Sequence, residues 1–186
     1  MRLEGRTAVV TGGSHGFGLA VATALAAEGA DLMICARGEE ALETARASLS
    51  AHVQPGRRVM STVVDVSRPE DSERLVSATY DAFGSLDVLV NNAGVYGPMG
   101  LLEEVDWDEW VRAIEINLMG TVLPCRAALP LMKKAGRGKI INLSGGGATA
   151  PLPRISAYAA SKAAVVRLTE TLAEEVRANG IDVNAV

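Results

Sequence analysis

The chain has 186 residues, a formal net charge of -4 at pH 7 and hydrophobic side chains at 48% of its positions. This length fits a single domain over residues 1–186 that buries a substantial core. The acidic balance, without a run of like charges, argues against nucleic acid as a partner. No uncharged apolar stretch of about 18 residues could cross a bilayer, and Cys35 and Cys125 have no metal-ligand spacing. The sequence therefore predicts a cytoplasmic protein with no membrane contact and no metal site.

Short apolar runs alternate with Ala- and Leu-rich stretches along the chain. The runs predict strands at 7–11, 31–36, 58–64, 86–90, 139–143 and 181–186, and the stretches predict helices at 17–28, 38–50, 69–83, 106–133 and 157–179. Val88-Leu89-Val90 has no polar face, which is typical of a parallel strand covered by helices on both sides. The alternation predicts a doubly wound parallel α/β sheet, the Rossmann arrangement, with strand order 3-2-1-4-5-6.

A glycine-rich segment leaves the first predicted strand and enters the first predicted helix. Backbone N–H groups at a helix N-terminus hold a pyrophosphate, and glycine lets the backbone come close to it. The segment therefore predicts a dinucleotide site made by Gly12, Ser14, His15, Gly16, Phe17 and Gly18. A turn that serves only to pack the helix on the strand is the alternative.

The end of the second predicted strand indicates which dinucleotide binds. An acidic side chain there would accept hydrogen bonds from the ribose 2′-hydroxyl of NAD. This chain has Ala36-Arg37 instead, and a guanidinium can make charge-assisted hydrogen bonds with a 2′-phosphate. We therefore expect NADP rather than NAD, with His15 as a second candidate donor. An arginine that simply faces solvent is the alternative.

Tyr158 and Lys162 are four residues apart in a predicted helix, so their side chains share one face. A free tyrosine, with a pKa of about 10, is a poor acid-base catalyst at neutral pH. A nearby cation stabilises the phenolate and lowers that pKa. The pair predicts an acid-base centre, although the same spacing also occurs in exposed helical pairs without a function.

Four motifs together resemble the short, single-domain type of the short-chain dehydrogenase/reductase family. They are Thr11-Gly12-x-x-x-Gly16-x-Gly18, Asn91-Asn92-Ala93-Gly94, Asn117 in a long helix, and Tyr158-x-x-x-Lys162. The resemblance implies hydride transfer between a nicotinamide and a carbonyl or secondary alcohol. Tyr158 would be the acid or base, Lys162 would lower its pKa and hold the nicotinamide ribose, and Asn117 would bind a relay water. An asparagine that satisfies a helix irregularity is the alternative for Asn117.

The resemblance also assigns cofactor contacts after the third and fourth strands. Asp65, with Val66 beside it, would bind adenine, and the alternative is an aspartate that caps the next helix. Asn91, Ala93 and Gly94 would lie beside the cofactor, and the alternative is a stabilising turn.

The main departure from the pattern of the family concerns its catalytic serine. The family places it thirteen residues before the tyrosine, and Gly145 occupies that position here. We expect Ser144, one residue earlier, to supply the hydroxyl that stabilises negative charge on the substrate oxygen, because the following glycines can absorb a shift. A serine that only terminates the strand is the alternative.

The chain stops at the sixth predicted strand, so we expect a truncated sequence that lacks the family's seventh, C-terminal strand. The resemblance further implies a homodimer or homotetramer through helix 157–179 and the helix that carries Trp107, Trp110 and Ile114. Two functions compete: an NADP(H)-dependent oxidoreductase for a small-molecule carbonyl or alcohol, and a nucleotide-binding module or sensor with weak or no catalysis.

Overall fold

Six parallel strands form one sheet in the computed structural model, which describes residues 2–186. The strands are β1 (Thr7–Thr11), β2 (Asp31–Ala36), β3 (Val59–Val63), β4 (Val88–Asn91), β5 (Gly138–Asn142) and β6 (Ile181–Ala185). Their order in the sheet is β3-β2-β1-β4-β5-β6, and every neighbouring pair is parallel. The doubly wound fold and its strand order are therefore confirmed.

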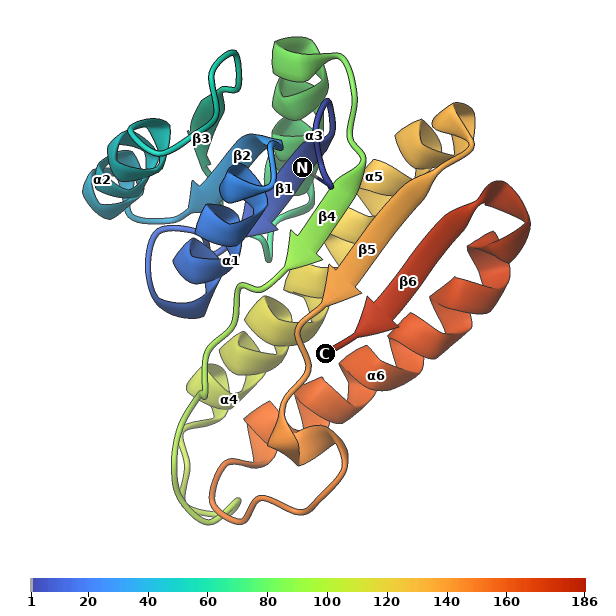
Figure 1. The fold of residues 1–186 in the computed structure, drawn as a ribbon. Helices are drawn as coiled ribbons and strands as arrows, with labels where there is room; N and C mark the ends of the chain where they lie inside the picture. The colour runs from blue at the N-terminus through green and yellow to red at the C-terminus, as the bar shows by residue number, and fades with distance from the viewer. Residues whose placement is uncertain (1) are drawn as a thin grey trace.

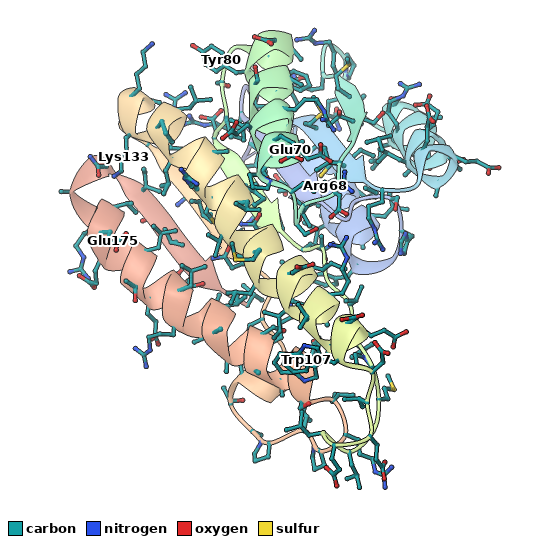
Figure 2. All side chains as sticks on the ribbon, turned by 180° about the vertical axis from the view of Figure 1, so that it is seen from behind. Arg68, Glu70, Tyr80, Trp107, Lys133 and Glu175 are labelled. Carbon is teal, nitrogen blue, oxygen red and sulfur yellow. The ribbon has the colours of Figure 1, made fainter. Side chains whose placement is uncertain are left out.

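Helices lie on both faces of the sheet, although the near face of β5 and β6 in Figure 1 carries none. Helices α1 (Gly16–Ala27) and α2 (Glu39–Ser50) pack into one hydrophobic cluster with the sheet, and α3 (Pro69–Phe83), α5 (Gly120–Ala135) and α6 (Ser156–Val176) pack into the other. Figure 2, seen from behind, has this second group of helices in front. Because both faces are covered at β1 and β4, these two strands are buried along their whole length.

Side chains of the strands alternate between the two clusters. In β1, Val9 belongs to the cluster under α3, α5 and α6, whereas Ala8 and Val10 belong to the cluster under α1 and α2. All three are fully buried. This period of two fixes the register of the strand, because a shift by one residue would exchange its two faces.

The predicted helix 106–133 is not continuous, which corrects the sequence analysis. Helix α4 (Trp107–Ile114) passes into a π-helical turn, η1 (Glu115–Met119), before α5 begins. The hydroxyl of Thr121 donates to the Asn117 carbonyl, and Pro124 inside α5 has no N–H to donate to the preceding turn. These two features interrupt the regular pattern, and π turns of this kind are frequent at functional sites.

The strand order reverses between β1 and β4, which are neighbours in the sheet although β2 and β3 separate them in sequence. In Figure 1 all the arrowheads point toward the same edge, where the loops after β1 and β4 emerge. In an open α/β sheet a ligand binds at such a reversal, outside the carboxyl ends of the strands. The functional site is expected there.

Candidate active site

The glycine-rich turn between β1 and α1 forms one wall of a cleft of about 450 Å³ at this edge. Gly12 and Gly16 have φ angles of 65° and 56°, a conformation that other residues rarely adopt. The N-cap residue His15 makes no side-chain hydrogen bond to α1, whose first turn carries no acidic residue. The turn therefore presents backbone donors to an anion in the cleft.

Most of the predicted cofactor residues line this one cleft. They are Gly12, Ser14, His15, Gly16, Phe17, Gly18, Arg37, Asp65, Val66, Ala93 and Gly94. The cleft thus gathers the carboxyl ends of β1, β2, β3 and β4.

Asn92 holds the glycine turn in place, although it is not among the site residues predicted from the sequence. Its side-chain amide donates to the carbonyls of Thr11 and Gly12 at 2.9 and 3.2 Å, and its backbone N–H donates to the Thr11 hydroxyl at 3.0 Å. A Cβ on Gly18 would overlap with both the Gly12 carbonyl and the Asn92 amide. Because α1 packs directly against the Gly12 carbonyl and the Asn92 amide, position 18 has no room for a side chain and needs glycine.

Arg37 follows β2 and lines the cleft with an exposed side chain. Among residues 2–186 no carboxylate forms a salt bridge with it. Its guanidinium is therefore available to a negatively charged ligand.

Asp65 follows β3 and is fixed by groups of its own loop and of α4. Its carboxylate accepts from Ser67 N at 3.1 Å, from Ser67 Oγ at 2.6 Å, and from Arg112 of α4 at 2.6 Å. Burial alone would raise the pKa of Asp65, but these hydrogen bonds outweigh it and lower the pKa. The side chain is therefore a charged acceptor at the cleft. Arg112 was missed because a sequence does not show which helix meets which strand end.

Asn91 does not line the cleft, which corrects the predicted cofactor contact of its side chain. It is 2% exposed, and its amide donates to Asn142 Oδ1 at 2.9 Å and to Cys125 Sγ at 3.1 Å. Because side chains alternate along a strand, Asn91 points into the protein and Asn92 points toward the turn. The side chain of Asn91 therefore links β4 to β5 and α5.

Tyr158 and Lys162 reach the same edge from α6. Lys162 Nζ lies 5.7 Å from the centroid of the Tyr158 ring and donates to the Leu143 carbonyl at 2.6 Å. A Cβ on Gly94 would lie 3.6 Å from that Nζ atom, and Gly94 lines the cleft. Lys162 therefore lies next to the lining of the cleft of the glycine turn, and the Tyr158 phenol lies next to Lys162.

The pKa of Tyr158 is raised, first by burial and second by Tyr96, whose ring centroid is 5.0 Å away. This direction is opposite to the one that sequence analysis expected from a neighbouring cation. Lys162 is itself buried, at 5% exposure, and burial lowers its pKa to about 8. Near pH 8 the ammonium is therefore only partly charged.

Replacing Lys162 with Met is expected to stabilise the fold. The unfolded lysine keeps its proton up to about pH 10.4, whereas the folded one loses it near pH 8. The unfolded state binds more protons between these values, so this lysine destabilises the fold fully below pH 8 and progressively less toward pH 10.4. The loss of the hydrogen bond to the Leu143 carbonyl offsets part of this gain. The free energy of unfolding of the variant should therefore exceed that of the wild type by about 1–2 kcal/mol at pH 7. Urea unfolding of both proteins at pH 7 and pH 9.5 measures this difference in unfolding free energy, which should be smaller at pH 9.5.

Lys133→Met, at the end of α5 (Figure 2), is the control for removing a lysine charge. A Lys162→Met protein less stable than the wild type at pH 7 would contradict the expectation.

Asn117 lies in the π turn and is fully buried. Its Oδ1 accepts from Val95 N at 2.8 Å, and its Nδ2 donates to Val95 O at 2.8 Å and to Ser161 Oγ at 2.9 Å. Both amide protons are therefore used, and the side chain ties the loop after β4 to α6. The side-chain amide protons of Asn117 are therefore not available to the predicted relay water.

Known proteins resemble this chain over nearly its whole length. The profile described as short chain dehydrogenase matches residues 6–186. The chain belongs to the short chain dehydrogenase family. A pig (Sus scrofa) protein named dehydrogenase/reductase SDR family member 4 is 35% identical over 184 residues, which is 99% of this chain and 65% of the relative. Levodione reductase of Leifsonia aquatica is 36% identical over 185 residues, or 100% of this chain and 69% of the relative.

Solved structures agree with this assignment. A crystal structure of levodione reductase has a TM-score of 0.95 with 36% identity, covering 99% of this chain and 71% of the other. A crystal structure of NAD+-bound xylitol dehydrogenase also has a TM-score of 0.95, with 32% identity, covering 100% of this chain and 70% of the other. The chain therefore spans about two thirds of the length of these relatives.

The hydroxyl of the predicted serine is buried. Ser144 Oγ is buried and has no hydrogen-bond partner among the described residues, while Ser144 N donates to the Val186 carbonyl at 2.7 Å. Gly145 is the residue beside Tyr158, since a Cβ there would fall within 3.0 Å of the phenolic oxygen. The Ser144 hydroxyl therefore makes no hydrogen bond with Tyr158, and Gly145 occupies the position beside the phenol.

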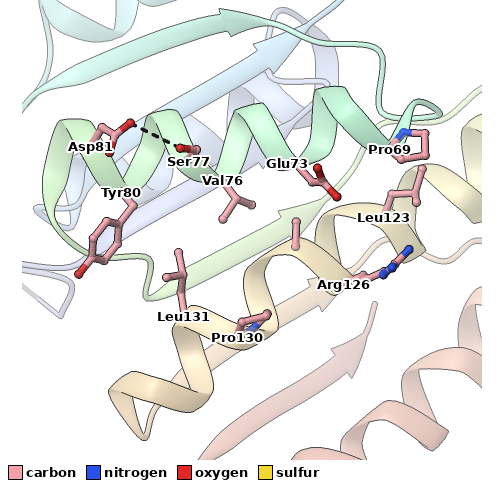
Figure 3. Close-up of a pocket in the computed structure, with 11 residues that line it drawn as sticks. Pro69, Glu73, Val76, Ser77, Tyr80, Asp81, Leu123, Arg126, Pro130 and Leu131 are labelled. Atoms are coloured by element: carbon pink, nitrogen blue, oxygen red, sulfur yellow. Dashed lines mark hydrogen bonds between the residues drawn. The ribbon is translucent and has the colours of Figure 1, made fainter.

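A second cleft, of about 440 Å³, lies between α3 and α5. In Figure 3 Val76 and Tyr80 of α3 face Pro130 and Leu131 of α5. It is similar in volume to the first cleft but contains none of the predicted site residues. The chemistry of the lining therefore identifies the cleft at the carboxyl edge of the sheet as the candidate active site.

Proposed function

We propose that the protein is an NADP(H)-dependent oxidoreductase that interconverts a carbonyl and a secondary alcohol, with Tyr158 as the acid or base. The meeting of Tyr158, Lys162 and Gly94 at the cleft of the glycine turn is the observation that supports it. The test is NADPH oxidation by the full-length protein against a panel of carbonyl compounds. Turnover of at least one of them is expected, and it should depend on Tyr158.

When bound, the dinucleotide supplies or accepts a hydride at the substrate carbon. In carbonyl reduction Tyr158 gives its phenolic proton to the carbonyl oxygen, and in alcohol oxidation the phenolate takes the hydroxyl proton. The raised pKa of Tyr158 keeps the phenol protonated at neutral pH, which favours reduction there. Lys162 would hold the nicotinamide ribose hydroxyls.

The remaining cofactor contacts follow from the lining of the cleft. The backbone of the glycine turn would hold the pyrophosphate. The Asp65 carboxylate would accept hydrogen bonds from adenine, and Arg37 would bind the 2′-phosphate of NADP. NAD, which the xylitol dehydrogenase structure names, is the less favoured cofactor because Ala36-Arg37, and no carboxylate, stands directly at the end of β2, where an acidic side chain would bind the 2′-hydroxyl of NAD.

Arg37→Gln is expected to weaken NADPH binding by about tenfold to a hundredfold, because it removes charge-assisted hydrogen bonds to the 2′-phosphate. The affinity for NADH, which has no such phosphate, should change little. Titration calorimetry of both cofactors against both proteins measures this.

Arg177→Gln, at the exposed end of α6, is the matched control and should bind both cofactors as the wild type does. Equal loss of NADPH and NADH affinity in the Arg37 variant would argue against a 2′-phosphate contact.

A nucleotide-binding module or sensor is the second candidate. The glycine beside Tyr158 and the buried Ser144 hydroxyl favour it, because they leave the substrate oxygen without the usual serine donor. Tight NADPH binding without oxidation across the carbonyl panel would select this function over the first.

We further propose a cytoplasmic homodimer or homotetramer. A surface groove between α5 and α6, lined by Val122, Leu129, Leu168 and Leu172 among others, supports a subunit contact on this face. Within residues 2–186 the helices include none with the length and hydropathy that crossing a membrane requires.

A further inference from the structure

Tyr96 is a second phenol at the reaction centre. It follows the Asn91-Asn92-Ala93-Gly94 segment, and its ring lies 5.0 Å from the Tyr158 ring, centroid to centroid, at an angle of 41°. The side chain is 59% exposed. None of the hydrogen bonds found among residues 2–186 uses its hydroxyl. Tyr96 therefore has a free donor next to the predicted acid.

The backbone on both sides of Tyr96 is fixed. The N–H and C=O of Val95 are both bonded to the buried Asn117 side chain. Gly97 has a φ of 75°, and a Cβ there would meet Ala113 Cβ at 2.6 Å and Ala157 Cβ at 3.6 Å. The loop is thus held between α4, the π turn and the start of α6, so the fold fixes the backbone that carries Tyr96.

The residue beside the Tyr158 phenol has no side-chain hydroxyl. Gly145 lies directly under the phenolic oxygen, and the Ser144 hydroxyl is buried without access to the cleft. A carbonyl oxygen that gains negative charge during hydride transfer is stabilised by a second, preorganised donor besides the acid. In this protein the exposed hydroxyl next to Tyr158 belongs to Tyr96.

We propose that Tyr96 is a catalytic residue that donates a hydrogen bond to the substrate oxygen, in place of a serine hydroxyl. Tyr96 keeps its own proton throughout, while the proton that bonds to the substrate oxygen comes from Tyr158. The proposal rests on the oxidoreductase function proposed above. It also accounts for the second contribution to the raised pKa of Tyr158, since two adjacent phenols resist ionising together.

Tyr96→Phe in the full-length protein tests the proposal, because it keeps the ring and removes only the hydroxyl. Loss of one donor to a developing oxyanion costs about 10²- to 10³-fold in kcat at a buried site. Since Tyr96 is half exposed, we expect the low end of that effect, between about tenfold and a hundredfold, with little change in KM and no change in NADPH affinity. The pH profile of oxidation should also move to lower pH, because the phenol that opposes ionisation of Tyr158 is gone.

Two further variants separate the outcomes. Tyr80→Phe, on the exposed face of α3, should match the wild type, and Tyr158→Phe should lose turnover. If Tyr158→Phe loses turnover while Tyr96→Phe keeps the wild-type kcat and pH profile, Tyr96 only packs against substrate and the inference is wrong. If Tyr158→Phe keeps full activity, the oxidoreductase mechanism and the inference both fail.

Discussion

Replacing Tyr158 with Phe is expected to lower kcat for carbonyl reduction by about 10²- to 10⁴-fold, the contribution of a positioned general acid. The variant keeps the aromatic ring that contacts Tyr96 and Lys162 and loses only the proton donor. The ring is partly exposed, so the fold should be unaffected. Steady-state NADPH oxidation with the best carbonyl of the panel measures the loss.

NADPH affinity is the internal control for this variant, because the pyrophosphate, adenine and 2′-phosphate contacts lie elsewhere in the cleft. The Kd should stay within about threefold of the wild-type value, which is less than 1 kcal/mol. A variant that binds NADPH normally and turns over as fast as the wild type would exclude Tyr158 as the acid.

Replacing Gly18 with Ala is expected to damage both stability and cofactor binding. The added Cβ would overlap with the Gly12 carbonyl and the Asn92 amide, which are parts of the backbone turn and of its brace. Overpacking of this kind costs about 1–3 kcal/mol of stability. The displaced turn should also bind the pyrophosphate at least about tenfold more weakly, because charge-assisted hydrogen bonds depend on geometry. Thermal unfolding and NADPH titration measure the two effects.

Gly146→Ala is the matched control, since a Cβ there has no neighbour within 4 Å and the φ angle is not positive. It should behave as the wild type in both assays. Unchanged NADPH affinity of the Gly18 variant would show that the turn does not hold the pyrophosphate.

The sheet could be predicted from the sequence because its signals are local. The strands β1, β2 and β4 are short, mostly apolar runs, and glycine follows β1 where the chain must turn tightly. The break in helix 106–133 was not predicted, because a proline alone does not mark it: Pro130 lies inside α5 just as Pro124 does, without a break. The apolar periodicity on either side of the break is still helical.

The sequence motifs predicted most of the site residues, but not the side chains that hold those residues in place. Asn92 and Arg112 act through contacts with residues 47 to 81 positions away, which no spacing rule identifies. Ser144 illustrates the same limit: the sequence placed a hydroxyl one residue from the expected position, and only the fold shows that the shift buries it. Tyr96 lay in a loop without a motif, and its pairing with Tyr158 appears only in three dimensions.

The most direct measurement is a crystal structure of the full-length protein with NADPH. The nicotinamide is expected beside Tyr158 and Lys162, leaving room for a substrate carbon about 3–3.5 Å from the hydride donor, with the pyrophosphate on the turn from Gly12 to Gly18. A dinucleotide bound elsewhere, or one whose nicotinamide lies away from the phenol, would contradict the assignment of this cleft as the active site.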